Sequence, residues 1–248
     1  MTIETIYEDG DVLVINKPAG LIVHSDGRTQ EPSVADWVLS KYPATVSVGE
    51  PWLSPQGEVV PRPGLVHRLD RTTSGIMVIA KTQEAFQFLK KQFQERSVQK
   101  QYEAFVYGHT KEDAGIIEAE IGRTKNKPRK WIASFAYGKK RAAVTKWRVL
   151  GRYKDAESGE ALSYMEVCPK TGRTHQIRVH LKAIHHPIIC DHLYAPKKAC
   201  LLGFQRPALH ARTLTFTLLG DETKTLEAPL PDDFTHALHL LGRMNRGV

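Results

Sequence analysis

The stretch HRLDRTTSG, residues 67–75, sets charged and hydroxyl side chains between two apolar segments, the second of which covers residues 76–80. A short, continuous apolar run of this kind is typical of a strand that is covered on both faces. A polar loop held between rigid strands is a common place for a reactive group. Asp70 is flanked by Arg68 and Arg71, and nearby positive charge favours the ionised form of a carboxyl group. The alternative interpretation is a solvated turn with a surface ion pair, which contributes little to stability.

A second polar segment, TGRTHQIRVHL, predicts a helix over residues 172–184 with Thr171 as its cap. On that helix His175 and Arg178 share a face, and Arg178 is expected to reach a buried carboxylate as a bidentate partner. The alternative is an amphipathic basic helix that lies against RNA or solvent. A metal site at His175 and His180 is not expected, because they are five residues apart and form no H-E-x-x-H pattern.

The remaining pattern predicts short strands and few helices in a chain of ordinary globular composition, 41% hydrophobic and 25% charged. Strands are predicted at residues 12–15, 144–150, 162–167 and 213–218. Further helices are predicted from an N-cap at Ser33, over residues 84–96 and over residues 233–241. Because strands and helices do not alternate, we expect an α+β fold with a mixed, mainly antiparallel central sheet and flanking helices. Residues 45–63 are rich in proline and glycine and are expected to form an exposed loop.

The net charge of +8 and the pI near 9.3 favour a polyanionic partner, and nucleic acid is the commonest one. Basic residues gather between positions 123 and 141, interleaved with aromatic residues. The basic residues expected to bind RNA phosphates there are Arg129, Lys130, Lys139 and Lys140. A solvated charged hairpin is the alternative.

The cysteines and the N-terminus indicate in which cellular compartment the protein is expected. Cys168, Cys190 and Cys200 are odd in number and form no C-x-x-C pair, which argues against a disulfide framework and a structural zinc site. No apolar run reaches the roughly 18–20 residues of a membrane span, and the N-terminus lacks the order of a signal peptide. We expect a cytoplasmic protein without metal, organised as a single domain over residues 1–248.

Seven segments in order along the chain resemble motifs of the RluA-type RNA pseudouridine synthase family. Residues 67–75 resemble its H-R-L-D-x-x-T-S-G motif, and residues 171–181 its T-G-R-T-H-Q-I-R-V-H-L motif. The other five are residues 16–24, 100–102, 186–194, 209–211 and 228–231. The second of these, Lys100-Gln101-Tyr102, is similar to the strand that carries the family's active-site tyrosine.

The resemblance implies a fold and a reaction. The fold is the pseudouridine synthase catalytic fold, with a basic central cleft and Asp70 at its middle. The reaction isomerises uridine in RNA, with Asp70 as the catalytic carboxylate, Arg178 as its ionic partner and Tyr102 stacked on the uracil. It needs no cofactor. The RNA is ribosomal or transfer RNA, a monomer suffices, and no separate N-terminal RNA-binding domain is expected.

The resemblance also implies residues that handle the RNA. The target nucleotide must leave the stack, and Arg68 is expected to enter the vacated space, with His67 and Arg71 beside it. Three further residues are expected to contact RNA, namely Lys17, Arg173 and His175.

One residue departs from the family pattern, and two other functions remain as alternatives. Cys190 stands where the family usually has glycine, so a positive φ at this position would strain the turn. One alternative is a catalytically silent RNA-binding or ribosome-assembly factor on the same fold. The other is a glycoside hydrolase, which normally needs two carboxylates beside the bond, whereas one lies in a motif here.

Overall fold

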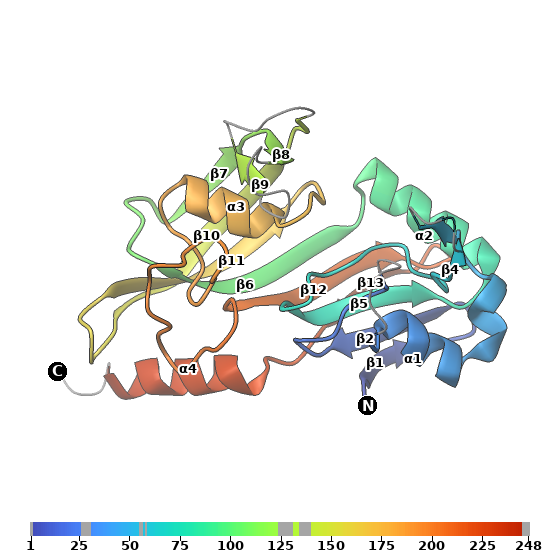
Figure 1. Cartoon of the computed structure of the whole chain (residues 1–248), viewed down its shortest axis with the longest axis horizontal. Helices are drawn as coiled ribbons and strands as arrows, with labels where there is room; N and C mark the ends of the chain where they lie inside the picture. The colour runs from blue at the N-terminus through green and yellow to red at the C-terminus, as the bar shows by residue number, and fades with distance from the viewer. Residues whose placement is uncertain are drawn as a thin grey trace. The chain divides into compact units, whose positions relative to one another are not determined.

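The computed structural model describes residues 2–25, 31–54, 57, 59–123, 131–133 and 140–244 (Figure 1). The chain forms two compact units, each assembled from segments that are far apart in the sequence. The first unit combines Met1–Gln99 with Ala211–Pro229, and the second combines Lys100–His210 with Leu230–Val248. The single domain expected over the whole chain stays a prediction.

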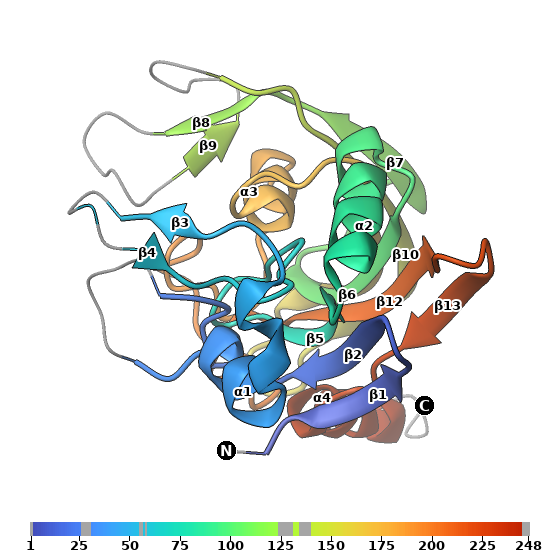
Figure 2. The ribbon, with the colours of Figure 1, turned by 90° about the vertical axis from the view of Figure 1, so that its right-hand side faces the viewer.

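The first unit is built on strands that lie side by side in Figures 1 and 2, and three of the neighbouring pairs are antiparallel. In spatial order they are β1 (Glu4–Glu8), β2 (Val12–Lys17), β5 (Ser74–Ala80), β12 (Leu209–Thr217, in this unit from Ala211 onward) and β13 (Thr223–Glu227). Every residue of β5 is buried. The prediction that the segment after the 67–75 stretch is a strand covered on both faces is therefore confirmed.

Two helices accompany these strands. Helix α1 (Val34–Lys41) begins with a capping box, in which Ser33 Oγ accepts the N–H of Asp36 and the Asp36 carboxylate accepts the N–H of Ser33. Helix α2 (Gln83–Glu95) packs against β5 and ends at Arg96, which has a left-handed φ of 64°. Both helices lie where the sequence predicts them.

The proline-rich stretch at residues 45–63 is more ordered than predicted. It contains the end of a 3₁₀ helix, η1 (Pro43–Ser47), and a small antiparallel pair, β3 (Trp52–Leu53) with β4 (Val59–Val60). The prediction of a loop throughout was wrong because the aromatic and β-branched residues between the prolines pair as strands.

The second unit also has an antiparallel sheet. In spatial order its strands are β6 (Gln99–Tyr107, in this unit from Lys100), β11 (Ala161–Pro169), β10 (Val144–Lys154) and β7 (Ala114–Glu118). A separate pair joins β8 (Ile121–Arg123) to β9 (Trp131–Ala133). The predicted strands at residues 144–150 and 162–167 are confirmed, and β10 runs on past a bulge between Val149 and Gly151.

Helices α3 (Gln176–Ala183) and α4 (Asp232–Met244) belong to the second unit. The unit's core is aromatic, with the rings of Phe105, Phe204 and Phe234 packed together at centroid distances of 5.2–5.7 Å. These contacts explain the amphipathic pattern that predicts the last helix, since Phe234 lies on its buried face.

Helix α3 begins four residues later than predicted. Its N-cap is His175, which has a left-handed φ of 55°. Thr171 does not cap it: the Thr171 hydroxyl donates to Gln176 Oε1 and accepts the N–H of Val144. The prediction failed because the Thr171 hydroxyl is used to tie the turn to β10.

The α+β class with mainly antiparallel pairing is confirmed. Among the described residues, no helix combines the length and apolar character needed to cross a membrane.

Candidate active site

Asp70 lies in the turn that leads into β5, in the first unit. Its side chain is partly exposed, whereas Leu69 and Thr73 on either side are buried. The Asp70 carbonyl accepts the N–H of Thr73 at 3.1 Å, which closes the turn. The turn therefore presents a carboxylate from a backbone that is anchored on both sides.

Lys17 is fully buried and contacts this turn from the interior of the protein. Its Nζ donates to the carbonyl oxygens of Pro18, Leu21 and Arg71, at 2.8, 2.9 and 3.3 Å. The N–H of Gly20 donates to the same Arg71 carbonyl at 2.8 Å. A buried ammonium is tolerated where carbonyl oxygens replace its water shell. The prediction that Lys17 contacts RNA is wrong, because its buried ammonium instead donates to carbonyl oxygens and so connects residues 18–21 to the Asp70 turn.

His67 has structural contacts at the start of the same turn. Its Nε2 accepts the N–H of Val78 in β5 at 3.0 Å, and its ring stacks on Phe93 of α2 with centroids 4.6 Å apart. A ring nitrogen that accepts from a backbone N–H carries no proton, so these contacts describe a neutral imidazole. The predicted role of His67 in base flipping stays untested.

Arg68 and Arg71 lie on the outer side of the turn. Arg68 is exposed, and Arg71 forms a half-exposed ion pair with Glu31 at 2.6 Å. A third guanidinium, that of Arg62, stacks over the Trp52 ring at 4.9 Å. Burial, and secondarily the positive charge of Arg68, lowers the pKa of Arg62. Positive charge therefore gathers beside the turn, and Arg62 contributes to it although its motif did not mark it as a site residue.

Arg178 lies on α3 in the second unit and is paired with Asp191. Its Nε donates to Asp191 Oδ2 at 2.7 Å and its Nη2 to Asp191 Oδ1 at 2.8 Å. The side chains are 8% and 0% exposed, so the pair is shielded from water. The predicted bidentate geometry is confirmed for Asp191. The pairing of Arg178 with Asp70, which belongs to the first unit, stays a prediction.

Asp191 and Tyr194 support Arg178, a role that was not predicted from the sequence. Asp191 Oδ1 also accepts the N–H groups of Leu193 and Tyr194, each at 3.1 Å, so the carboxylate organises its own turn. The Tyr194 ring lies under the Arg178 guanidinium at 5.0 Å, and its hydroxyl bonds to His175 Nδ1 at 2.9 Å. The spacing D-x-x-Y after the H-P-I segment was the available signal for this support.

Tyr102 lies on β6 opposite Val167 of β11 and is partly buried against the core of the second unit. The next residue, Glu103, is buried and accepts a hydrogen bond from the hydroxyl of Tyr164. The structure thus fixes the strand that carries Tyr102, while the residue itself stays partly exposed.

Only some of the remaining residues that were predicted to contact RNA lie in the described part of the structure. Arg173 Nε donates to the Ala142 carbonyl at 3.2 Å, and Lys140 is exposed. Arg129, Lys130 and Lys139 lie outside the described residues.

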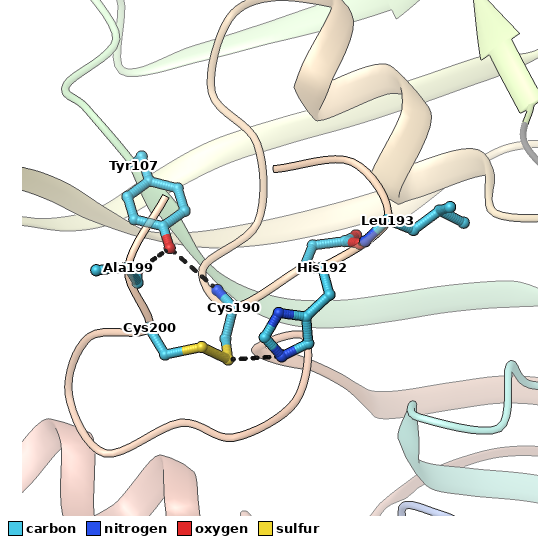
Figure 3. Close-up of a disulfide and its surroundings, with 7 residues drawn as sticks. Tyr107, Cys190, His192, Leu193, Ala199 and Cys200 are labelled. Carbon is cyan, nitrogen blue, oxygen red and sulfur yellow. Dashed lines mark hydrogen bonds between the residues drawn. A yellow bond between two sulfur atoms is a disulfide. The ribbon is translucent and has the colours of Figure 1, made fainter. Parts of the chain in front are cut away.

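The cysteines differ from the expectation. Cys190 and Cys200 form a disulfide, so the argument against disulfides was wrong for this pair (Figure 3). Residues 190–200 fold back until the two Cα atoms are 4.5 Å apart, which sequence spacing does not reveal. The expectation of a cytoplasmic protein therefore has no support from the cysteines. Cys190 has a φ of 58°, the conformation for which glycine is favoured.

Comparisons with known proteins agree with these features. Residues 11–183 match the family model for RNA pseudouridylate synthase. The chain is 41% identical to the ribosomal large subunit pseudouridine synthase D of Neisseria meningitidis, over 100% of this chain and 63% of that protein. It is 40% identical to the protein of the same name from Pseudomonas aeruginosa, over 96% of this chain and 72% of that protein. The chain thus spans less than two thirds of the length of the Neisseria relative.

Among solved structures, human RNA pseudouridylate synthase domain containing 1 has the same fold, with a TM-score of 0.73 at 24% identity, covering 100% of this chain and 96% of that one. The match of the family model to residues 11–183 includes the Asp70 turn, Tyr102 and Arg178. By the extent of that match and by identity to the Pseudomonas protein, the chain is a member of the RNA pseudouridylate synthase family.

Proposed function

We propose that this chain isomerises uridine to pseudouridine in RNA, with Asp70 as the catalytic carboxylate. The observation that carries the proposal is the anchored turn: Asp70 is partly exposed while its neighbours Leu69 and Thr73 are buried. Lys17 holds the backbone at Arg71 from the inside. A reactive group needs this combination of a fixed backbone and an accessible side chain.

The reaction requires a carboxylate near the sugar. The bond between N1 of uracil and C1′ of ribose breaks, the base turns, and a bond from C5 to C1′ replaces it. An ionised carboxylate serves either as a nucleophile or as a stabiliser of positive charge at the sugar. C5 loses one proton and N1 takes one up, either directly or by exchange with solvent, so atoms and electrons balance without a redox partner.

Tyr102 and Arg178 complete the proposed catalytic set. Tyr102 is partly exposed, and an aromatic residue with a phenol hydroxyl is suited to stack on uracil and to assist proton transfer. Arg178 supplies a positive charge that favours an ionised carboxylate, and its bidentate bond to Asp191 fixes the direction of the guanidinium.

The proposal assigns RNA handling to the outer side of the Asp70 turn. A target uridine must leave the RNA stack before a carboxylate reaches its sugar. Arg68 is exposed beside Asp70 and lies near the Arg62 guanidinium, so this surface attracts phosphate. We assign to Arg68 the stacking or hydrogen bonding that fills the vacated position.

Ribosomal RNA of the large subunit is the proposed substrate. The Neisseria and Pseudomonas relatives are named as ribosomal large subunit enzymes, which supports this choice over transfer RNA. Such a substrate fits the net charge of +8 and a cytoplasmic protein that acts as a monomer.

The test compares two RNA classes in one assay. Large-subunit ribosomal RNA transcripts and transfer RNA transcripts are incubated with the full chain, and pseudouridine is located by carbodiimide adducts that stop reverse transcription. New stops in the ribosomal transcripts alone support the whole proposal. Stops in transfer RNA alone support the reaction but overturn the substrate. RNA binding with no stops in either class favours the silent RNA-binding factor.

A further inference from the structure

Three side chains that the proposed reaction does not use meet in the second unit, in the loop between α3 and β12. Cys190, His192 and Cys200 bring their sulfur and ring nitrogen atoms within 4.8 Å of one another (Figure 3). Cys190 Sγ and His192 Nε2 are 3.7 Å apart. Thiolate and imidazole are the ligands that zinc prefers in proteins.

We propose that in the reduced protein these three side chains bind one Zn²⁺ ion. Zinc binds sulfur at about 2.3 Å and imidazole nitrogen at about 2.0–2.1 Å with tetrahedral angles, which puts two such ligand atoms about 3.6 Å apart. The distance between Cys190 Sγ and His192 Nε2 already matches that requirement. The Cys200 sulfur needs only to separate from its disulfide partner to become the third ligand.

The disulfide and the metal site exclude each other, and a dithiol reductant converts one into the other. The dithiol gives two electrons and two protons to the Cys190–Cys200 bond and becomes a disulfide itself. Zn²⁺ then replaces the two thiol protons, which leave to solvent. Water fills the fourth position, because three described side chains converge there.

The backbone around the cluster is held by a residue other than the cysteines. The Tyr107 hydroxyl accepts the N–H of Cys190 at 3.2 Å and donates to the carbonyl of Ala199, next to Cys200 (Figure 3). The two arms that carry the sulfur atoms therefore stay together when the disulfide opens.

The cluster is also open to metal from solvent. Cys190 is buried at 2% exposure, whereas His192 and Cys200 are exposed. This arrangement gives the site one rigid ligand and two ligands that can adjust to a metal. The next residue after Cys190 is Asp191, so the site adjoins the support of Arg178 without containing any residue of the proposed catalytic set.

The experiment uses the full chain in two redox states. Protein reduced with a dithiol, then freed of reductant without air, is mixed with Zn²⁺, passed through a desalting column and analysed for bound zinc. Reduced wild type is expected to retain about one ion per chain with three protein ligands, and air-oxidised protein to retain little. Co²⁺ in place of Zn²⁺ is expected to give a sulfur-to-metal charge-transfer absorption.

Variants separate the site from other thiols. Cys200→Ser, His192→Gln and Cys190→Gly are each expected to weaken zinc binding by more than about 100-fold, since loss of a partner outside the ligand shell already costs 10–100-fold. Glycine adopts the φ of 58° at position 190 without strain, so Cys190→Gly is expected to fold. Circular dichroism of this variant checks that a loss of zinc is not caused by a loss of fold. Cys168→Ser is the control, because Cys168 is the free cysteine. Reduced wild type without bound zinc, or Cys168→Ser as deficient as Cys200→Ser, would overturn the proposal.

Discussion

Arg178 and Asp191 form a two-point ion pair that is shielded from water, with Nε to Oδ2 at 2.7 Å and Nη2 to Oδ1 at 2.8 Å. A second pair has the same geometry at the surface: Arg148 Nε and Nη2 each lie 2.7 Å from a Glu166 oxygen, with the Arg148 side chain 59% exposed. The Glu166 side chain is 14% exposed and the Asp191 side chain 0%. Asp191 also accepts the N–H groups of Leu193 and Tyr194, so the two pairs share a two-point geometry but differ in burial and in backbone contacts.

Asp191→Asn is expected to lower the free energy of unfolding by about 3–5 kcal/mol, because it removes one charge of a buried pair. The matched change in the exposed pair, Glu166→Gln, is expected to cost no more than about 1 kcal/mol. Urea unfolding followed by circular dichroism measures both. Equal decreases in the free energy of unfolding of the two variants would show that burial does not increase the contribution of the Arg178–Asp191 pair to stability.

Lys17→Met is expected to lower the free energy of unfolding by at least about 2 kcal/mol, since each buried carbonyl left without a donor costs about 1–3 kcal/mol. It should also slow turnover, because the Arg71 carbonyl and with it the Asp70 turn lose their internal support. The salt dependence of RNA binding should not change, since the Lys17 ammonium is buried. Lys140→Met, at an exposed lysine, is the control. If Lys17→Met reduced the slope of log K against log salt as much as this control does, Lys17 would have to contact phosphate.

The burial of His180 predicts that the folded protein loses stability in mild acid. Burial lowers its pKa, with a smaller opposite effect from the Ala119 carbonyl, and Nδ1 bonds to the Thr145 hydroxyl at 2.9 Å. Below the unfolded pKa of about 6.5 the unfolded chain takes up a proton that the folded chain resists, so stability falls as the pH falls. The contribution is at most about 1.4 kcal/mol per pH unit. Urea midpoints for wild type should decline more steeply than those for His180→Asn; parallel pH profiles would show that His180 does not contribute.

The predicted contact of the basic residues at positions 139–141 with RNA is testable by salt titration. Lys139→Ala/Lys140→Ala should weaken binding to all RNAs alike and reduce the slope of log K against log salt by about 0.7–0.9 for each phosphate that the lysines no longer neutralise. Filter binding at several salt concentrations measures both quantities. Affinity and slope equal to those of wild type would leave this surface as a solvated hairpin.

Local patterns predicted much of the fold because the physics behind them is local. The capping box at Ser33 and the apolar run of β5 need only neighbouring residues, and both are confirmed. The start of α3 was misplaced because the Thr171 hydroxyl bonds to β10, a contact that spans 27 positions. The grouping of residues 211–229 with the N-terminal segment is equally non-local and was not predicted.

The candidate site shows the same division. The bidentate geometry of Arg178 follows from its residue type and helix position, but the identity of its partner as Asp191 needs the folded turn. Lys17 was misassigned because its sequence neighbourhood does not reveal that its ammonium is enclosed by three carbonyl oxygens. The bond between Cys190 and Cys200 depends on how the 190–200 loop folds back, which no residue count reports.

The central claim is that the charge of Asp70 drives uridine isomerisation. The most direct measurement is tritium release from RNA labelled at C5 of uridine, comparing wild type with Asp70→Asn, which keeps the shape of the side chain and removes its charge. Filter binding of the same RNA shows that both proteins still bind it. We predict release by wild type and a loss of at least about 10³-fold in the variant, the scale seen when a catalytic group is removed. Release by Asp70→Asn at the wild-type rate would contradict the claim.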